Sequence, residues 1–125
     1  MTIALNLLNI NKKYEDITAL KDINLEVKDG EFFSLLGPSG SGKTTCLKVI
    51  AGFEIPDVGE INLFGQDVSS IPPFKRNVNT VFQDYALFPH MNVKENVAYS
   101  LKIKKIPKSA QEKLINEILL TVKLQ

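Results

Sequence analysis

The sequence predicts an α/β fold in which a β-rich part precedes a helical part. Three observations support this prediction. A glycine-rich loop, residues 37–45, lies between an apolar run and a helical pattern. Before the loop, apolar residues recur at every second position, as in a half-buried strand. Beyond Pro89 the period changes to about 3.6, which indicates helices with one apolar face.

Strand signals dominate the first part. Residues 3–10 are mostly apolar and predict a first strand. Residues 22–28 alternate between apolar and polar, which predicts an antiparallel strand buried on one face. Asp29-Gly30 is a hairpin-type turn signal, so residues 31–36 are expected to form the hairpin partner and to lead into the loop. Further strands are expected at 60–64, closed by Gly65, and at 77–82, which should be buried.

Helix signals follow the loop and fill the last part of the chain. A helix is expected over 44–51, ended by Gly52. Asn92 with Glu95 resembles a capping box at the start of a second helix. Ser109 with Glu112 is expected to open a third helix, whose apolar stripe is Leu114, Ile115, Ile118, Leu119 and Val122. The helical pattern continues to Gln125 without a stop signal, which predicts a truncated domain.

The length, charge and cysteine content of the chain limit the classes of function that it can have. A chain of 125 residues suffices for one modest domain, and its formal net charge of +1 gives no electrostatic case for nucleic-acid binding. No apolar run approaches the ~20 residues needed to cross a bilayer. Lys12 and Lys13 follow the first apolar segment, which is the wrong order for a secretory signal. Cys46 is the only cysteine, so an internal disulfide is excluded, and a small buried side chain is its expected role.

The loop fits the phosphate-binding pattern G-x-x-x-x-G-K-[ST]. Its residues are Gly37, Pro38, Ser39, Gly40, Ser41, Gly42, Lys43, Thr44 and Thr45. The glycines let successive N–H groups point at an anion, and the following helix adds its positive end. Lys43 can bind the β- and γ-phosphates, and the Thr44 hydroxyl can ligate Mg²⁺. We therefore predict a nucleoside triphosphate site. A glycine-rich linker is the alternative, which the flanking apolar segments disfavour.

The whole chain resembles the amino-terminal half of the ATP-binding subunit of ABC transporters. The loop is followed by residues 47–52, Leu-Lys-Val-Ile-Ala-Gly, the typical continuation in that family. Tyr14 falls where these subunits place an aromatic that stacks on adenine. Residues 81–91, Val-Phe-Gln-Asp-Tyr-Ala-Leu-Phe-Pro-His-Met, look like their glutamine loop. The resemblance implies a P-loop NTPase core with an antiparallel β subdomain, and ATP and Mg²⁺ as ligands.

The resemblance also implies roles for individual residues. Lys43 and Gln83 would be catalytic, and Thr44 and Gln83 would ligate Mg²⁺. Tyr14 would hold adenine, although without the family context an aromatic at a strand edge is the simpler interpretation. Gln83 is expected at the end of a buried strand, and the alternative is that it is an ordinary polar residue at a strand end. Residues 1–83 would form the β-rich and phosphate-loop core, and 84–125 the glutamine loop and the start of a helical subdomain.

Partners follow from the same resemblance. In the family, two ATP-binding subunits dimerise and drive transmembrane permease subunits at the cytoplasmic face of the cell membrane, and importers receive solute from a periplasmic or surface binding protein. The segment Tyr85 to Met91 would dock on the permease. Residues 77–91 are most similar to spermidine/putrescine importers, while iron, sulfate and sugar importers differ little there.

A non-transport ATPase or an inactive remnant remains an alternative. A GTPase is disfavoured because no Asn-Lys-x-Asp follows the loop, and the glutamine-loop match argues against a small-molecule kinase.

Several parts that the family needs for hydrolysis are missing from these residues. No apolar strand ends in Asp-Glu after Gln83, and Leu-Ser-Gly-Gly-Gln is absent because Gly65 is the last glycine. His90 is the only histidine and lies seven residues after Gln83, in the wrong place for the family's switch histidine. Without these groups the transition-state charge is poorly stabilised. We therefore expect this chain to bind ATP without turning it over.

Overall fold

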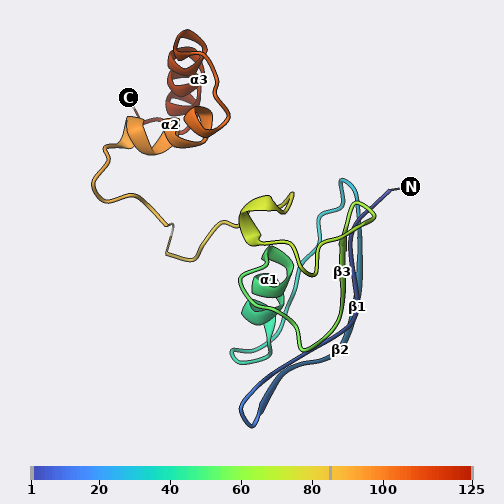
Figure 1. The fold of residues 1–125 in the computed structure, drawn as a ribbon. Helices are drawn as coiled ribbons and strands as arrows, with labels where there is room; N and C mark the ends of the chain where they lie inside the picture. The colour runs from blue at the N-terminus through green and yellow to red at the C-terminus, as the bar shows by residue number, and fades with distance from the viewer. Residues whose placement is uncertain (1, 85, 125) are drawn as a thin grey trace. The chain divides into compact units, whose positions relative to one another are not determined.

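The computed structural model describes residues 2–84 and 86–124 (Figure 1). The chain forms two compact units, Met1–Thr80 and Val81–Gln125. The first unit holds a β-sheet and one helix, and the second holds a pair of helices. No helix in the described ranges has the length and apolar character needed to span a membrane.

A four-stranded antiparallel sheet forms the frame of the first unit. Its strands are β1 (Ile3–Tyr14), β2 (Ile17–Lys28), β3 (Val58–Leu63) and β4 (Gln66–Asp67), in the spatial order β2-β1-β3-β4. The long β1–β2 pair turns between Tyr14 and Ile17, which face each other across the hairpin. Both strands are longer than the sequence predicts, because the end of β1 pairs with the start of β2: Lys12 with Leu20, Lys13 with Thr18 and Tyr14 with Ile17.

A tight turn joins the last two strands. Phe64 and Gly65 connect β3 to β4, and both have positive φ angles, 48° and 79°. Two such residues in succession give the turn type that matches the natural twist of a hairpin. The strand predicted at 60–64 is thus present, but it begins two residues earlier, at Val58, and ends at Leu63.

The helix that follows the glycine-rich loop lies against one face of this sheet (Figure 1). This helix, α1, spans Lys43–Ala51 and ends at Gly52, whose φ of 91° forms a left-handed cap, as the sequence predicts. Side chains from β1, β2, β3 and α1 share one apolar core. Its buried members are Leu7, Ile10, Leu20, Cys46, Val49, Ile61, Leu63 and Val68.

Two predicted strands are wrong. Residues 31–36 and 77–82 have no regular secondary structure. Within the described residues neither segment pairs with a strand of the sheet, and a strand cannot form without a neighbour that satisfies its N–H and C=O groups. Several of their apolar side chains are open to solvent, since Phe32 is 94% exposed, Leu36 93% and Val81 92%, whereas Leu35 and Val78 pack against the core. The Asp29-Gly30 turn is present, but it does not close a hairpin.

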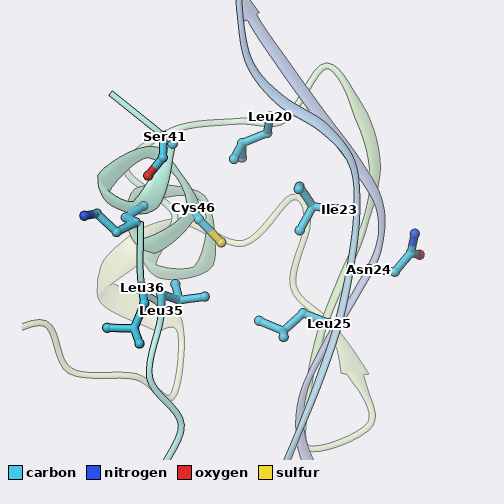
Figure 2. Close-up of a pocket in the computed structure, with 10 residues that line it drawn as sticks. Leu20, Ile23, Asn24, Leu25, Leu35, Leu36, Ser41 and Cys46 are labelled. Carbon is cyan, nitrogen blue, oxygen red and sulfur yellow. The ribbon is translucent and has the colours of Figure 1, made fainter. Parts of the chain in front are cut away.

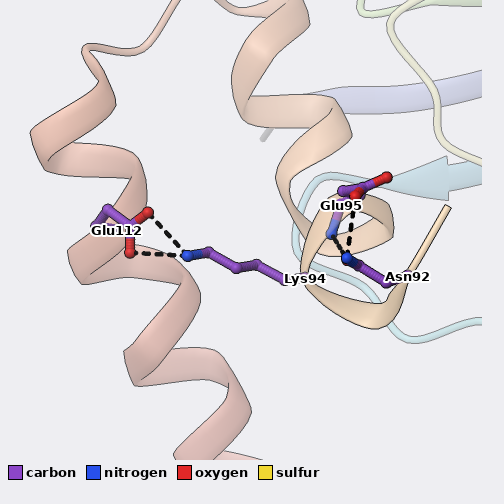
Figure 3. Close-up of polar contacts among 4 residues, drawn as sticks. All are labelled: Asn92, Lys94, Glu95 and Glu112. Atoms are coloured by element: carbon purple, nitrogen blue, oxygen red, sulfur yellow. Dashed lines mark hydrogen bonds and ion pairs between the residues drawn. The ribbon is translucent and has the colours of Figure 1, made fainter.

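Two helices make up the second unit. The first, α2, spans Val93–Ile103, and the second, α3, spans Lys108–Thr121. The Asn92 side chain caps α2 by accepting from the Glu95 N–H at 2.8 Å, which confirms the predicted cap (Figure 3). Lys94 and Glu112 join the two helices by an ion pair of 2.9 Å.

The third predicted helix needs two corrections. Pro107, not Ser109, is its N-cap residue, because proline's fixed φ suits the entry to a helix and its missing N–H costs nothing there. The helix also ends at Thr121, so Val122 lies past its last turn, whereas the sequence predicts a helix that runs to the last residue. Gln125 lies outside the described residues.

Core packing in the first unit leads to a stability prediction. Leu7 is fully buried, whereas its neighbour Leu8 points to the other face of β1 and is 38% exposed. Leu7→Ala should lower the free energy of unfolding of the first unit by about 2–5 kcal/mol, because it leaves a cavity. The matched control Leu8→Ala should cost about 1 kcal/mol or less. Urea unfolding followed by circular dichroism measures both, and equal losses would contradict this assignment of the core.

Candidate phosphate-binding site

The glycine-rich loop bends sharply before it enters α1. The Ser41 N–H donates to the Pro38 carbonyl at 3.2 Å, which closes a turn. Gly40 and Gly42 adopt left-handed φ angles of 81° and 93°, a conformation that side chains disfavour. Two glycines at these positions therefore let the backbone curl around a small space, as the sequence predicts.

Gly42 is required for a second reason, the close approach of β2. A Cβ placed on Gly42 would lie 2.5 Å from the Ala19 carbonyl oxygen and 3.1 Å from the Leu20 side chain. Only glycine allows the start of α1 to touch the strand this closely. The β1–β2 hairpin thus fixes where the first turn of the helix begins.

The first turn of α1 presents free hydrogen-bond donors. Gly42 is the N-cap residue and offers no side chain to accept from them, and the first turn contains no acidic residue. The N–H groups at the start of a helix lack partners within the helix, and the helix dipole adds partial positive charge there. This end of α1 is consequently suited to an anion such as a phosphate group.

Lys43 adds a full positive charge to the same place. Its ammonium group donates to the Gly37 carbonyl, so the side chain folds back across the loop. A Cβ on Gly37 would lie 2.7 Å from the Ser41 hydroxyl, so the two ends of the loop also meet closely. Thr44 is exposed and Thr45 half-buried, and a hydroxyl on an exposed first turn can reach a metal ion. The structure thus brings the predicted residues 37–45 together around one space.

An apolar pocket of about 200 Å³ lies between β2 and the loop (Figure 2). Leu20, Ile23 and Leu25 line one side, and Leu35, Leu36 and Cys46 line the other, whereas Asn24 points away. The Cys46 thiol is 5% exposed, and burial raises its pKa. Its expected role as a small buried side chain is confirmed.

Tyr14 lies at the last residue of β1, near the end of the hairpin. It faces Ile17 across the hairpin. Ala19, two residues after Ile17, has the carbonyl that comes close to Gly42. The Tyr14 side chain is 38% exposed, and the Lys12 ammonium lies 5.2 Å from its ring centroid. The ring therefore lies outside the core, partly exposed at the end of the hairpin.

Gln83 belongs to the second unit. It lies in an exposed turn and not at the end of a buried strand, so that part of the prediction is wrong. Tyr85 lies outside the described residues. Among the remaining residues of the predicted docking segment, Leu87 is 70% exposed, whereas Phe88 packs on Tyr99 with their ring centroids 4.6 Å apart. His90 is exposed, as expected of a surface residue.

Sequence reasoning missed the side chain that shapes this segment, Asn96. The Asn96 carboxamide oxygen accepts from the Phe88 N–H at 2.9 Å, and its NH₂ group donates to the Met91 and Asn92 carbonyls at 3.1 and 2.8 Å. One side chain of α2 thereby holds the loop that precedes the helix through hydrogen bonds to its backbone. Asparagine inside a predicted helix gives no signal of this, because its usual position there is on the surface.

A second missed residue is Arg76, which directly follows a short 3₁₀ helix, Pro73–Lys75. It is the one buried charged residue in the part of the chain that the structure describes, at 7% exposure. Its guanidinium group contacts the last carbonyls of α1. The neighbouring Lys75 is exposed, and the sequence does not distinguish the two.

Comparisons with known proteins agree with this geometry. The ABC transporter family model matches residues 20–125. An uncharacterized ABC transporter ATP-binding protein of Escherichia coli, YdcT, is 52% identical over 99% of this chain and 37% of its own length. The spermidine/putrescine import ATP-binding proteins PotA of Clostridioides difficile and Lawsonia intracellularis are 53% and 54% identical, each over 97% of this chain. The chain spans 35% and 33% of those two relatives.

Solved structures show the same fold. The dimeric bacterial ABC transporter cassette MJ0796 superposes with a TM-score of 0.84, at 31% identity over 97% of this chain and 58% of that one. A dimeric post-hydrolysis state of MJ0796 bound to ADP and Pi gives a TM-score of 0.82 with the same identity and coverage. The antiparallel sheet, the glycine-rich loop and the helices thus form part of an ABC ATPase cassette, and the chain belongs to the ABC transporter family.

Proposed function

We propose that this chain binds Mg-ATP as part of the ATP-binding subunit of an ABC importer. The observation that carries the proposal is the start of α1, where backbone donors without a side-chain cap, two left-handed glycines and Lys43 surround one space. Such a site takes the phosphates of a nucleotide. The structure of a related cassette bound to ADP and Pi supports adenine nucleotide as the ligand.

Each candidate residue has a role in this proposal. The amides of residues 37–45 hold the phosphates, and Lys43 leaves the Gly37 carbonyl to bind the β- and γ-phosphates. The Thr44 hydroxyl is proposed as a Mg²⁺ ligand. Gln83 is proposed, from the family resemblance, as a further Mg²⁺ ligand whose carboxamide also positions the attacking water. Tyr14 stacks on adenine from the end of the hairpin. Lys43 and Gln83 are the catalytic residues of the intact subunit.

The proposed partners are a second ATP-binding subunit and transmembrane permease subunits, served by a solute-binding protein on the other side of the membrane. Dimeric structures of a related cassette support the first. The resemblance of residues 81–91 to the glutamine loop of the family supports permease docking, and Leu87 in that segment is exposed. On this proposal the protein works at the cytoplasmic face of the cell membrane. Residues 1–83 form the β-rich and phosphate-loop core, and 84–125 form the glutamine loop and the start of a helical subdomain.

The proposed solute is a polyamine, spermidine or putrescine. The names of two relatives at 53% and 54% identity support it, as does the sequence of residues 77–91. Iron, sulfate and sugar importers are the alternatives, since solute choice lies in other subunits.

Loss of the loop lysine tests the nucleotide site. Lys43→Ala should weaken Mg-ATP binding at least tenfold, because the β- and γ-phosphates lose a charge-assisted contact worth about 1.5–3 kcal/mol. The matched control Lys48→Ala, an exposed lysine in the last turn of the same helix, should change the affinity less than twofold. Titration calorimetry on the 125-residue polypeptide measures both. Equal affinities for Lys43→Ala and the original chain would exclude the site.

The same samples test turnover. The 125 residues contain no Asp-Glu pair after Gln83 to activate water, so we propose that this polypeptide binds ATP and releases phosphate no faster than its Lys43→Ala variant. A coupled phosphate-release assay measures the rate. Steady turnover that Lys43→Ala abolishes would contradict this part of the proposal.

The polyamine assignment requires the complete transporter. Cells that carry the full-length protein with its permease should take up radiolabelled spermidine, and excess putrescine should compete, whereas sulfate should not. Lys43→Ala in the full-length protein should stop the uptake. Uptake that sulfate or a sugar suppresses while putrescine does not would favour one of the alternative solutes.

A further inference from the structure

Arg76 holds the C-terminal end of α1, the helix that follows the phosphate loop. Its Nη1 donates to the Val49 and Ile50 carbonyls at 3.0 and 3.1 Å, and its Nε donates to the Ile71 carbonyl at 2.8 Å. The carbonyls in the last turn of a helix have no partner within the helix. One guanidinium group therefore satisfies the Ile50 carbonyl and shares the Val49 carbonyl with the Gly52 N–H, which donates to it at 3.2 Å. It also joins both carbonyls to the segment before the 3₁₀ helix.

The helix end is shaped to receive this side chain. Gly52 adopts a φ of 91°, and its N–H donates back to the Lys48 carbonyl at 3.0 Å, which turns the chain away. A Cβ on Gly52 would lie 2.7 Å from the Arg76 Nε. Glycine at this position thus serves the turn and also leaves room for the guanidinium group.

The charge of Arg76 suits its place. A cation at the C-terminal end of a helix interacts favourably with the helix dipole. Burial lowers the pKa of Arg76, and the nearby Asp67 carboxylate opposes this effect. Arginine nevertheless stays charged because its ordinary pKa is far above neutral. A buried charge is tolerated only where hydrogen bonds satisfy it, as the three carbonyls do here.

We propose that Arg76 is a positioning residue for nucleotide binding, an inference that rests on the proposed function. The helix has nine residues, so its two ends are only about 13 Å apart at 1.5 Å per residue. Gly42 fixes one end against β2 and Arg76 fixes the other. A helix whose last carbonyls are no longer held by Arg76 can tilt. A tilt displaces the phosphate-binding amides from the phosphates of the nucleotide. A displacement of about 1 Å is enough to weaken a site of this kind.

Graded substitutions of Arg76 test this proposal. Arg76→Gln, which removes the charge and the forked donors, should weaken Mg-ATP binding about tenfold at a temperature where the sample is fully folded. Arg76→Lys keeps the positive charge but carries all its N–H donors on one nitrogen atom. It should weaken Mg-ATP binding about threefold. The matched control is Lys75→Gln, an exposed neighbour whose ammonium lies 5.7 Å from the Phe74 ring centroid; it should stay within twofold.

The outcomes separate this inference from the proposed function. Calorimetry with Mg-ATP on the 125-residue chain is the readout, and circular dichroism confirms folding of each variant. A purely structural role lowers the unfolding temperature but leaves the dissociation constant of the folded variant unchanged. That result in Arg76→Gln, or in Arg76→Lys if the glutamine variant does not fold, overturns the inference alone. A folded original chain that binds no Mg-ATP overturns the proposed function and this inference with it.

Discussion

The close approach of the Ala19 carbonyl to Gly42 is the constraint on which the proposed phosphate site depends. A helix can present its first N–H groups to an anion only if its start is held still and stays open. Here β2 comes so close that a Cβ on Gly42 would lie 2.5 Å from that carbonyl, so no side chain fits at the N-cap. The same glycine that permits the close contact also leaves the donors without a side-chain acceptor. The tight packing of the helix start and its uncapped backbone donors therefore have one cause.

The rest of the first unit keeps this contact in place. Val49 and Cys46 on α1 are buried against Leu7, Ile10 and Ile61 of the sheet, which fixes the rotation of the helix. Arg76 then holds its last carbonyls. The apolar core, the glycine contact and the buried arginine act at three places along a short helix. Such a helix has little intrinsic stability of its own, and tertiary packing has to supply it.

Sequence reasoning succeeded where the signal is local. The loop at 37–45, the end of α1 at Gly52 and the Asn92 cap each depend on a few neighbouring residues, and all are present. It failed where the structure depends on distant partners. Residues 31–36 and 77–82 have the apolar content of strands, but a strand requires a paired neighbour, and periodicity does not reveal whether these 125 residues supply one. Asn96 and Arg76 were missed for a related reason, because the hydrogen-bond partners of a polar side chain are known only once the fold is known.

The central claim is that the backbone amides of residues 37–45 bind the phosphates of a nucleotide. Amide resonances of ¹⁵N-labelled protein, recorded with and without Mg-ATP, test it residue by residue. The account predicts the largest shifts at Gly40, Gly42 and Lys43, and small shifts on β3 and β4. A folded sample whose loop amides stay unchanged at saturating nucleotide, or whose shifts lie only outside the loop, would contradict it.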